Sequence, residues 1–176
     1  MNLQFFAEEK SMSTSVKERR MQADYLNIGD GAAEEWELMG TGYTDLNEKP
    51  SAQTKDKRYI NMKSKSKSIV GYDWSSEFTA DQIPSQKTIK YLLDIGKLQK
   101  TGADAETDYV MVDLDESAEV ANTFHARKIH VAVEIADFGN EDGEMNVTGN
   151  LLGKSDIVEG YFNTDTNTFT TEKPTA

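Results

Sequence analysis

The stretch VANTFHARKIHVAVEIADF, residues 120–138, decides the fold. Its second half alternates between two kinds of side chain: Ile129, Val131, Val133 and Ile135 are apolar, and His130, Ala132, Glu134 and Ala136 stand between them. A period of two predicts a β-strand with one apolar face. A regular strand over the whole stretch would span roughly 60 Å, more than one small sandwich needs. We therefore expect a bend inside it, or an end that reaches past the domain.

The flanking sequence carries the patterns of further strands and of one helix. We expect strands within residues 33–42, 54–61, 69–80, 109–114, 145–151, 157–162 and 168–171, with 145–151 as the hairpin partner of 129–135. An amphipathic helix is expected over residues 85–97, with Pro84 just before its start and Gly96 close to its end. About eight strands joined mostly by hairpins predict a mainly β fold: an antiparallel β-sandwich or barrel-like domain with one flanking α-helix.

The chain of 176 residues is long enough for one domain with a real core. We expect an N-terminal arm over residues 1–24, with a weak helical pattern across 16–26. The β-sandwich follows over residues 25–171 and includes a long loop at 47–68. Residues 172–176 form a C-terminal tail.

Charge is unevenly distributed along the chain, which has a net charge of −12. The basic residues Lys55, Lys57, Arg58, Lys63, Lys65 and Lys67 stand in residues 50–68 with the single acid Asp56, which gives +5. Residues 101–176 hold sixteen acids and four bases, which gives −12. Such a chain can attract its own copies head to tail. The alternative is that both segments are solvated faces.

No pattern in the sequence indicates catalysis, a cofactor or a metal. There is no cysteine, and His125 and His130 are five residues apart, on opposite faces of a regular strand. Asp113, Asp115 and Glu116 have no phosphate-binding loop beside them, so we interpret them as solvated acids. We expect a protein without enzymatic activity.

The composition also restricts the partners. A net charge of −12 argues against tight DNA binding, and no apolar run approaches the roughly 20 residues of a membrane helix. Residues 1–10 do not form a secretory signal, so we expect synthesis in a cytoplasm. For the basic repeat at 63–67, a protein contact, nucleic-acid contact and a solvated loop all stay open.

Several segments together resemble the major tail tube protein of tailed bacteriophages that infect Gram-positive bacteria. The similar segments are residues 36–42, 59–61, 68–72, 78–81, the helix at 89–95, and the ending at 158–162 and 169–170; the opening residues 1–7 are also similar to the start of some phage structural proteins. The likeness covers roughly residues 34–172 and involves structural segments rather than catalytic ones.

The resemblance implies a β-sandwich flanked by a helix, assembled as hexameric rings that stack into a tube. The inner strands would join into one barrel around the tape measure protein, and DNA would pass through without specific binding at ejection. Tail terminator and baseplate or tip proteins would be further partners. The location would be the virion tail, with assembly in the host cytoplasm.

In that family the loop at 47–68 reaches the neighbouring ring, and the terminal arms commonly do the same. We therefore expect inter-ring contacts from Lys55, Lys57, Arg58, Lys63, Lys65 and Lys67. The polar side of the long hairpin gives the residues expected to face the lumen: His130, Glu134, Asn146, Thr148 and Asn150.

Two other functions remain open. The first is a different virion or tailocin module, such as a tail terminator or a head–tail connector, which would stop at one ring. The second is a carbohydrate-binding β-sandwich, which needs an exposed aromatic platform. Trp36, Trp74 and Tyr161 are the candidates for that platform, although we expect them in the core.

Overall fold

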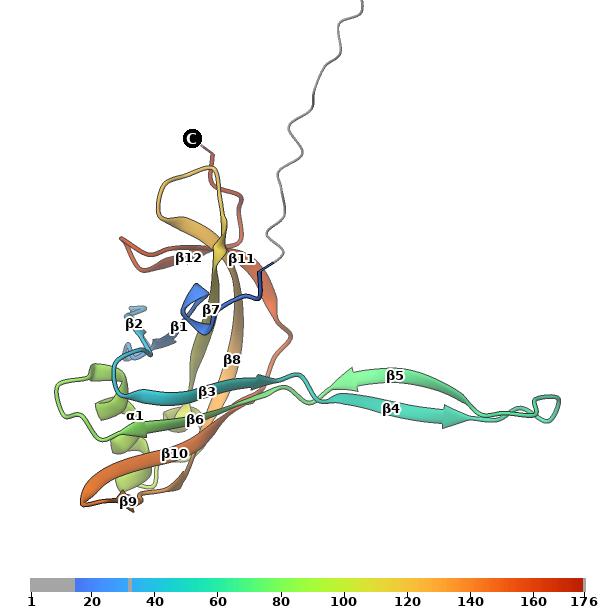
Figure 1. Cartoon of the computed structure of the whole chain (residues 1–176), viewed down its shortest axis with the longest axis horizontal. Helices are drawn as coiled ribbons and strands as arrows, with labels where there is room; N and C mark the ends of the chain where they lie inside the picture. The colour runs from blue at the N-terminus through green and yellow to red at the C-terminus, as the bar shows by residue number, and fades with distance from the viewer. Residues whose placement is uncertain (1–14, 32, 176) are drawn as a thin grey trace, which may run out of the picture.

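The computed structural model describes residues 15–31 and 33–175, which form a mainly β domain with one α-helix (Figure 1). The strands are β1 Gln22–Asn27, β2 Trp36–Leu38, β3 Tyr43–Lys49, β4 Ala52–Lys57, β5 Ser66–Tyr72, β6 Ser75–Asp81, β7 Glu106–Ser117, β8 Thr123–Asp137, β9 Asn140–Glu141, β10 Glu144–Gly153, β11 Val158–Asn163 and β12 Thr168–Thr170. The helix is α1 Lys87–Lys97, and the 3-10 turns are η1 Arg19–Met21 and η2 Gly102–Ala105.

The long strand β8 organises the sheet. Along one edge it pairs with β7, from Phe124 to Ala132. Along its other edge it pairs first with β11, through Thr123 to Lys128, and then with β10, from Val131 onward. The register with β10 shifts where Asp137 lies opposite Thr148 and Ile135 opposite Gly149, so one β8 residue is extra there. The expected bend is confirmed, and Figure 1 shows β8 curving between the two halves of the sheet.

The bend brings two parts of the sheet face to face around the main core. The array β8-β10-β6-β3 lies on one side, and β1 and β7 lie on the other. Trp74 and Phe78 of the first part pack with Tyr109 and Met111 of β7, and the Trp74 and Tyr109 ring centroids are 5.8 Å apart. Helix α1 adds Ile89 and its neighbours to the same cluster. Burial of this apolar face is the main favourable term for the fold.

The opposite face of β7 is buried as well. Val110 and Val112 pack with Tyr25, Trp36 and Phe162 in a second, smaller cluster. Consequently four consecutive residues, 109–112, are each at most 1% exposed. A strand buried on both faces gives an apolar run rather than an alternation. The alternation of β8 is confirmed, because Ile129, Val131 and Val133 are buried and Glu134 is exposed.

Polar contacts tie the facing parts together across the core. Arg127, in the first half of β8 where that strand pairs with β7, makes a two-pronged ion pair with Glu48 of β3 at 2.9 and 3.1 Å. The indole of Trp74 donates to the same carboxylate at 2.7 Å. Such paired, charge-assisted bonds fix geometry as well as adding energy. On β1, the buried Asp24 accepts a hydrogen bond from the Tyr109 hydroxyl at 2.6 Å and pairs with Arg19. Burial raises the pKa of Tyr109 well above its ordinary value.

The structure corrects some of the sequence-based boundaries. The helix indicated by the weak pattern across residues 16–26 is not formed. Arg19–Met21 is a 3-10 turn and Gln22–Asn27 is strand β1. The expected arm thus includes three residues of the sheet, 22–24, and its residues 1–14 lie outside the described part. The strand expected at 54–61 is Ala52–Lys57 instead. The described residues form twelve strands rather than about eight, several of them very short.

Gly149 allows β10 to cross close to β8 and Phe78. A Cβ atom there would fall against the Glu134 carbonyl oxygen and 2.6 Å from the Phe78 ring. We predict that Gly149→Ala lowers the free energy of unfolding by about 1–3 kcal/mol through overpacking. Chemical denaturation measures the change. Gly71→Ala is the matched control, because nothing lies within 4 Å of that Cβ. Equal stabilities for both variants would contradict the close approach.

Candidate assembly surfaces

A two-stranded β-hairpin projects from the domain. Strands β4 and β5 form their own antiparallel sheet, which continues outward from β3 and β6 (Figure 1). Every residue from 49 to 70 is exposed. An isolated hairpin of this kind is at best marginally stable in water. Packing against another surface would stabilise such a hairpin.

The two faces of this hairpin differ. Thr54 lies opposite Ile69, and Ala52 opposite Tyr72, so these side chains share one face. Ile69 is 59% exposed and Tyr72 is 64% exposed. Apolar side chains along an exposed stem favour burial against a protein surface.

The hairpin carries all six basic residues that the sequence singled out. Lys55 and Lys57 lie opposite serines on the second face of the stem, and Lys67 lies opposite Asp56 on the first. Arg58, Lys63 and Lys65 belong to the connecting turn at residues 58–65, which we call the tip. The alternating Lys-Ser repeat is therefore divided between the tip and β5 rather than forming one strand face.

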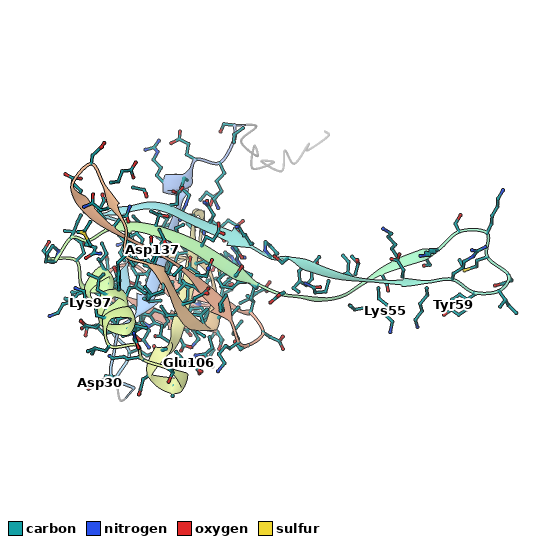
Figure 2. The ribbon with its side chains drawn as sticks, turned by 90° about the horizontal axis from the view of Figure 1, so that it is seen from below. Asp30, Lys55, Tyr59, Lys97, Glu106 and Asp137 are labelled. Carbon is teal, nitrogen blue, oxygen red and sulfur yellow. The ribbon has the colours of Figure 1, made fainter. Side chains whose placement is uncertain are left out.

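The tip also presents apolar side chains. Ile60 is fully exposed, Tyr59 is 59% exposed and Met62 is 38% exposed. A backbone bond from Met62 N–H to the Tyr59 carbonyl, 3.0 Å, closes the turn. The strand expected at 54–61 therefore ends before Tyr59 and Ile60, which lie in the turn. Figure 2 shows Tyr59 at the end of the hairpin, far from the body of the domain.

The array β8-β10-β6-β3 exposes a polar face on the side away from α1. Its centre is a shallow hollow of about 440 Å³ lined by Asp45, Asn47, Glu77, Thr79, Ala136, Thr148 and Asn150. Asn150 donates to Glu134 at 2.8 Å, and Lys49 pairs with Glu77 at 2.5 Å. Acids outnumber bases on this face.

Both borders of this array are unpaired within the described residues. Strand β3 pairs with β6 on one side only. At the other border, β7 pairs with β8 only as far as Ala132, so residues 134–137 of β8 bond to β10 alone. Four strands of alternating direction separate the two open edges. An open edge is a template for pairing with another chain.

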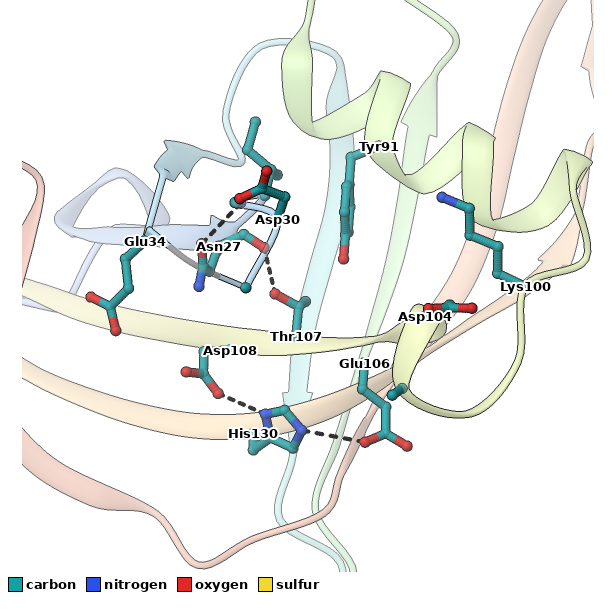
Figure 3. A pocket seen from close by; sticks show the side chains of 14 residues that line it. Asn27, Asp30, Glu34, Tyr91, Lys100, Asp104, Glu106, Thr107, Asp108 and His130 are labelled. Carbon is teal, nitrogen blue, oxygen red and sulfur yellow. Dashed lines mark hydrogen bonds and ion pairs between the residues drawn. The ribbon is translucent and has the colours of Figure 1, made fainter.

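A pocket of about 810 Å³ opens beside the start of β7 (Figure 3). Its wall consists of the end of β1 and the loop after it, Tyr91 of α1, the turn η2 and the start of β7, with His130 at one side. Five carboxylates line it: Asp30, Glu34, Asp104, Glu106 and Asp108. We call this the acidic pocket. Lys100 is the one lysine among its lining residues.

Three of these carboxylates have cationic or hydrogen-bonding partners. Asp108 lies 2.7 Å from Nδ1 of His130, and Glu34 accepts a hydrogen bond from the Trp36 indole at 3.0 Å. Lys128 also lies 3.9 Å from each of these two carboxylates. Lys154, 2.5 Å from Glu106, lowers the pKa of that carboxyl below its ordinary value. Asp30 and Asp104 form no side-chain hydrogen bond or ion pair with any described residue. Both side chains are exposed to solvent.

The expected lumen residues fall into two groups. Glu134 and Asn150 are bonded to each other, and Thr148 and Asn146 follow on the same side of β10. His130 lies instead in the acidic pocket, between Glu106 and Asp108. Sequence reasoning missed this pocket. Glu106 and Asp108 do share a strand face two residues apart, but only the fold brings the loops holding Asp30 and Asp104 beside them.

The alternatives of metal binding and carbohydrate binding gain no support from the described residues. No group of three or more potential ligands there is placed to hold a metal ion. His125 stacks on Tyr161, with ring centroids 4.7 Å apart, away from His130. Trp36 and Trp74 are 3% and 7% exposed, so they cannot form the aromatic platform of a sugar-binding surface. No helix in the described residues is both long and apolar enough to cross a membrane.

The sequence matches no protein-family model and no curated protein. The fold of this chain is similar to the folds of several solved structures. One is a chain from the tail of an empty GTA particle with C6 symmetry, with 11% identity, a TM-score of 0.54, and coverage of 81% of this chain and 97% of that one. Another comes from the six-fold symmetrised baseplate of an anti-feeding prophage, with 9% identity, a TM-score of 0.51, and coverage of 86% and 98%. The chain has a fold that occurs in these tail-particle proteins.

The exposed hairpin should be the first site of tryptic cleavage in the unassembled chain. Its lysines and arginine lie on an exposed stem and tip, whereas Arg127 and Lys128 lie within a paired strand of the main sheet. We predict early cuts between residues 55 and 67, identified by mass spectrometry of the fragments. First cuts within β7 or β8 would contradict the projecting hairpin.

Proposed function

We propose that this chain is a structural, non-enzymatic subunit of a phage-type tail, and specifically a tail tube subunit. The observation that carries the proposal is the pair of open edges on one four-stranded array. The likeness in fold to chains of six-fold tail particles supports it. The projecting hairpin supports contacts in a second direction. The location would be the virion tail, after assembly in the host cytoplasm.

Ring formation follows from the open edges. Because β8, β10, β6 and β3 alternate in direction, β3 and β8 run antiparallel. Rotation about a common axis would place the β3 edge of one copy beside residues 134–137 of the next, as an antiparallel pair. Repetition of this head-to-tail contact closes a ring and removes the free edges. Six copies would give one continuous barrel.

The polar face would then line the lumen. Asp45, Glu77 and Glu134 would present an acidic wall that repels the DNA backbone, so DNA could slide through without sticking. Glu134, Asn146, Thr148 and Asn150 stay our proposed lumen residues. The lumen would hold the tape measure protein before ejection, and terminator and baseplate or tip proteins would bind the ends of the tube.

Stacking would use the hairpin at residues 52–72, which includes residues 52–68 of the loop expected at 47–68. Its six basic residues would meet acidic surface on the neighbouring ring, with the apolar stem face buried in the same contact. The terminal arms would add inter-ring contacts. A second candidate function is another tail module, favoured by the likeness to a baseplate chain. Such a module would stop at one ring.

Purified protein should form hollow tubes in negative-stain micrographs at high concentration. Lys63→Glu/Lys65→Glu/Lys67→Glu should raise the concentration needed for stacking by about tenfold or more, because attraction becomes repulsion. The fold should be unaffected, because these side chains are exposed. Arg20→Glu/Lys90→Glu/Lys97→Glu makes the same charge change on the body and should stack normally. Tubes of unchanged length from the hairpin variant would refute its role, and a wild-type chain that stays monomeric would refute the tube.

The lumen can be tested by chemical access. Asn150→Cys creates the only thiol, because the chain has no cysteine. In assembled tubes a small maleimide should label it, whereas a maleimide on a bulky polymer should react much more slowly than with dissociated protein. Lys90→Cys on the outer face of α1 is the control and should react with both reagents. Equal access of the bulky reagent to both sites in tubes would place residue 150 outside the lumen.

A further inference from the structure

We infer that the acidic pocket receives the tip of the β4–β5 hairpin of another copy of this chain. The inference rests on the proposed function, since it names the acceptor for the stacking contact. It concerns one cavity and one turn, both present in every copy. The occupant is the tip itself, residues 58–65.

The contact cannot form within one chain. The paired register of Ala52–Lys57 with Ser66–Tyr72 holds the hairpin extended. Figure 2 shows Tyr59 at the far end of the hairpin, whereas Asp30 and Glu106 lie on the body. Figure 1 shows the same separation of the hairpin from the domain in a perpendicular view. A tip that enters the pocket therefore belongs to a second copy.

Charge complementarity selects the tip as the occupant. The tip carries Arg58, Lys63 and Lys65 and no acid. The pocket carries five carboxylates and one lysine. Asp30 and Asp104 have no partner among the described residues, and neither do Lys63 and Lys65. Lys100 of the pocket likewise has no side-chain partner in the described part of the chain, so the unpaired groups of the pocket are two anions and one cation. Pairing of Lys63 and Lys65 with Asp30 and Asp104 would steer association and set its orientation.

The apolar groups match as well. Tyr91 projects from α1 into the pocket (Figure 3), and Ile28 is also among the lining residues. Ile60 at the tip is fully exposed in the isolated chain. Insertion of Ile60 toward Tyr91 would bury apolar surface at the centre, with the charge pairs around it, as in well-packed interface anchors. The volume of about 810 Å³ falls in the roughly 300–1,000 Å³ range of cavities that bury a ligand-sized group.

The contact is heterologous, because a tip on one copy meets a pocket on the next. Each copy keeps a free tip and a free pocket, so the contact propagates rather than closing between two molecules. A symmetric tip-to-tip contact would instead stop at a dimer.

Disulfide trapping tests the docking directly. Ile60→Cys/Ala103→Cys places one thiol on the tip and one at the rim of the pocket in a chain without other cysteines. A bond forms only where the Cβ atoms approach within about 4.5 Å. Under mild oxidation we expect a ladder of trimers and higher species on non-reducing gels. Each single variant should give dimers at most. Ile60→Cys/Glu116→Cys, whose second thiol lies at the other end of β7, is the matched control.

The outcomes separate the docking from the proposed function. A ladder from the 60/103 pair without one from the 60/116 pair supports the docking, whether or not long tubes are visible. Tubes without the 60/103 ladder overturn the docking and leave the tube proposal standing. Protein that forms neither tubes nor cross-links overturns both.

Discussion

The fold depends on the long strand β8, which pairs with three other strands of the main sheet. Along one edge β8 offers hydrogen-bonding groups to two successive partners, β11 and then β10, while β7 follows its other edge. The partners diverge, so the strand must bend, and the bend folds one sheet onto itself. The main core fills the angle, and Arg127 with Glu48 ties the parts across it. One local consequence of the bend is that the regular pairing of β8 with β10 is interrupted near Ala136.

The same constraint leaves the array β8-β10-β6-β3 unfinished. Strand β7 follows β8 out of the plane of the array, so the last residues of β8 lose their neighbour on that side. At the opposite border no strand of the described residues pairs with the outer side of β3, and β3 continues into a hairpin that projects away from the domain. Exposed apolar groups and free edges are costs for a lone molecule. The proposed assembly of copies would offset both costs, and for this reason we favour a polymer over a binding module.

The sequence predicted the periodic parts of the structure and missed what depends on distant contacts. The alternation at Ile129–Ile135, the hairpin partner in β10 and helix α1 follow from local patterns, and all three are present. Strand β1 was mistaken for a weak helix, because Asp24 within it is polar yet buried through Tyr109 and Arg19. A tertiary hydrogen-bond network leaves no period in a sequence. The acidic pocket was invisible for a related reason: Asp30, Asp104 and Asp108 come from three segments that only the fold brings together.

The most direct measurement of the central claim is hydrogen–deuterium exchange of dissociated and assembled protein. Backbone amides of Tyr43–Lys49 and of the hairpin strand Ser66–Tyr72 should exchange much more slowly after assembly, because neighbouring copies would complete the open edge and cover the stem. Amides in the middle of β7, already buried on both faces, should change little. Unchanged exchange in β3 and in the hairpin, with tubes present in the sample, would contradict completion of the sheet by neighbouring copies.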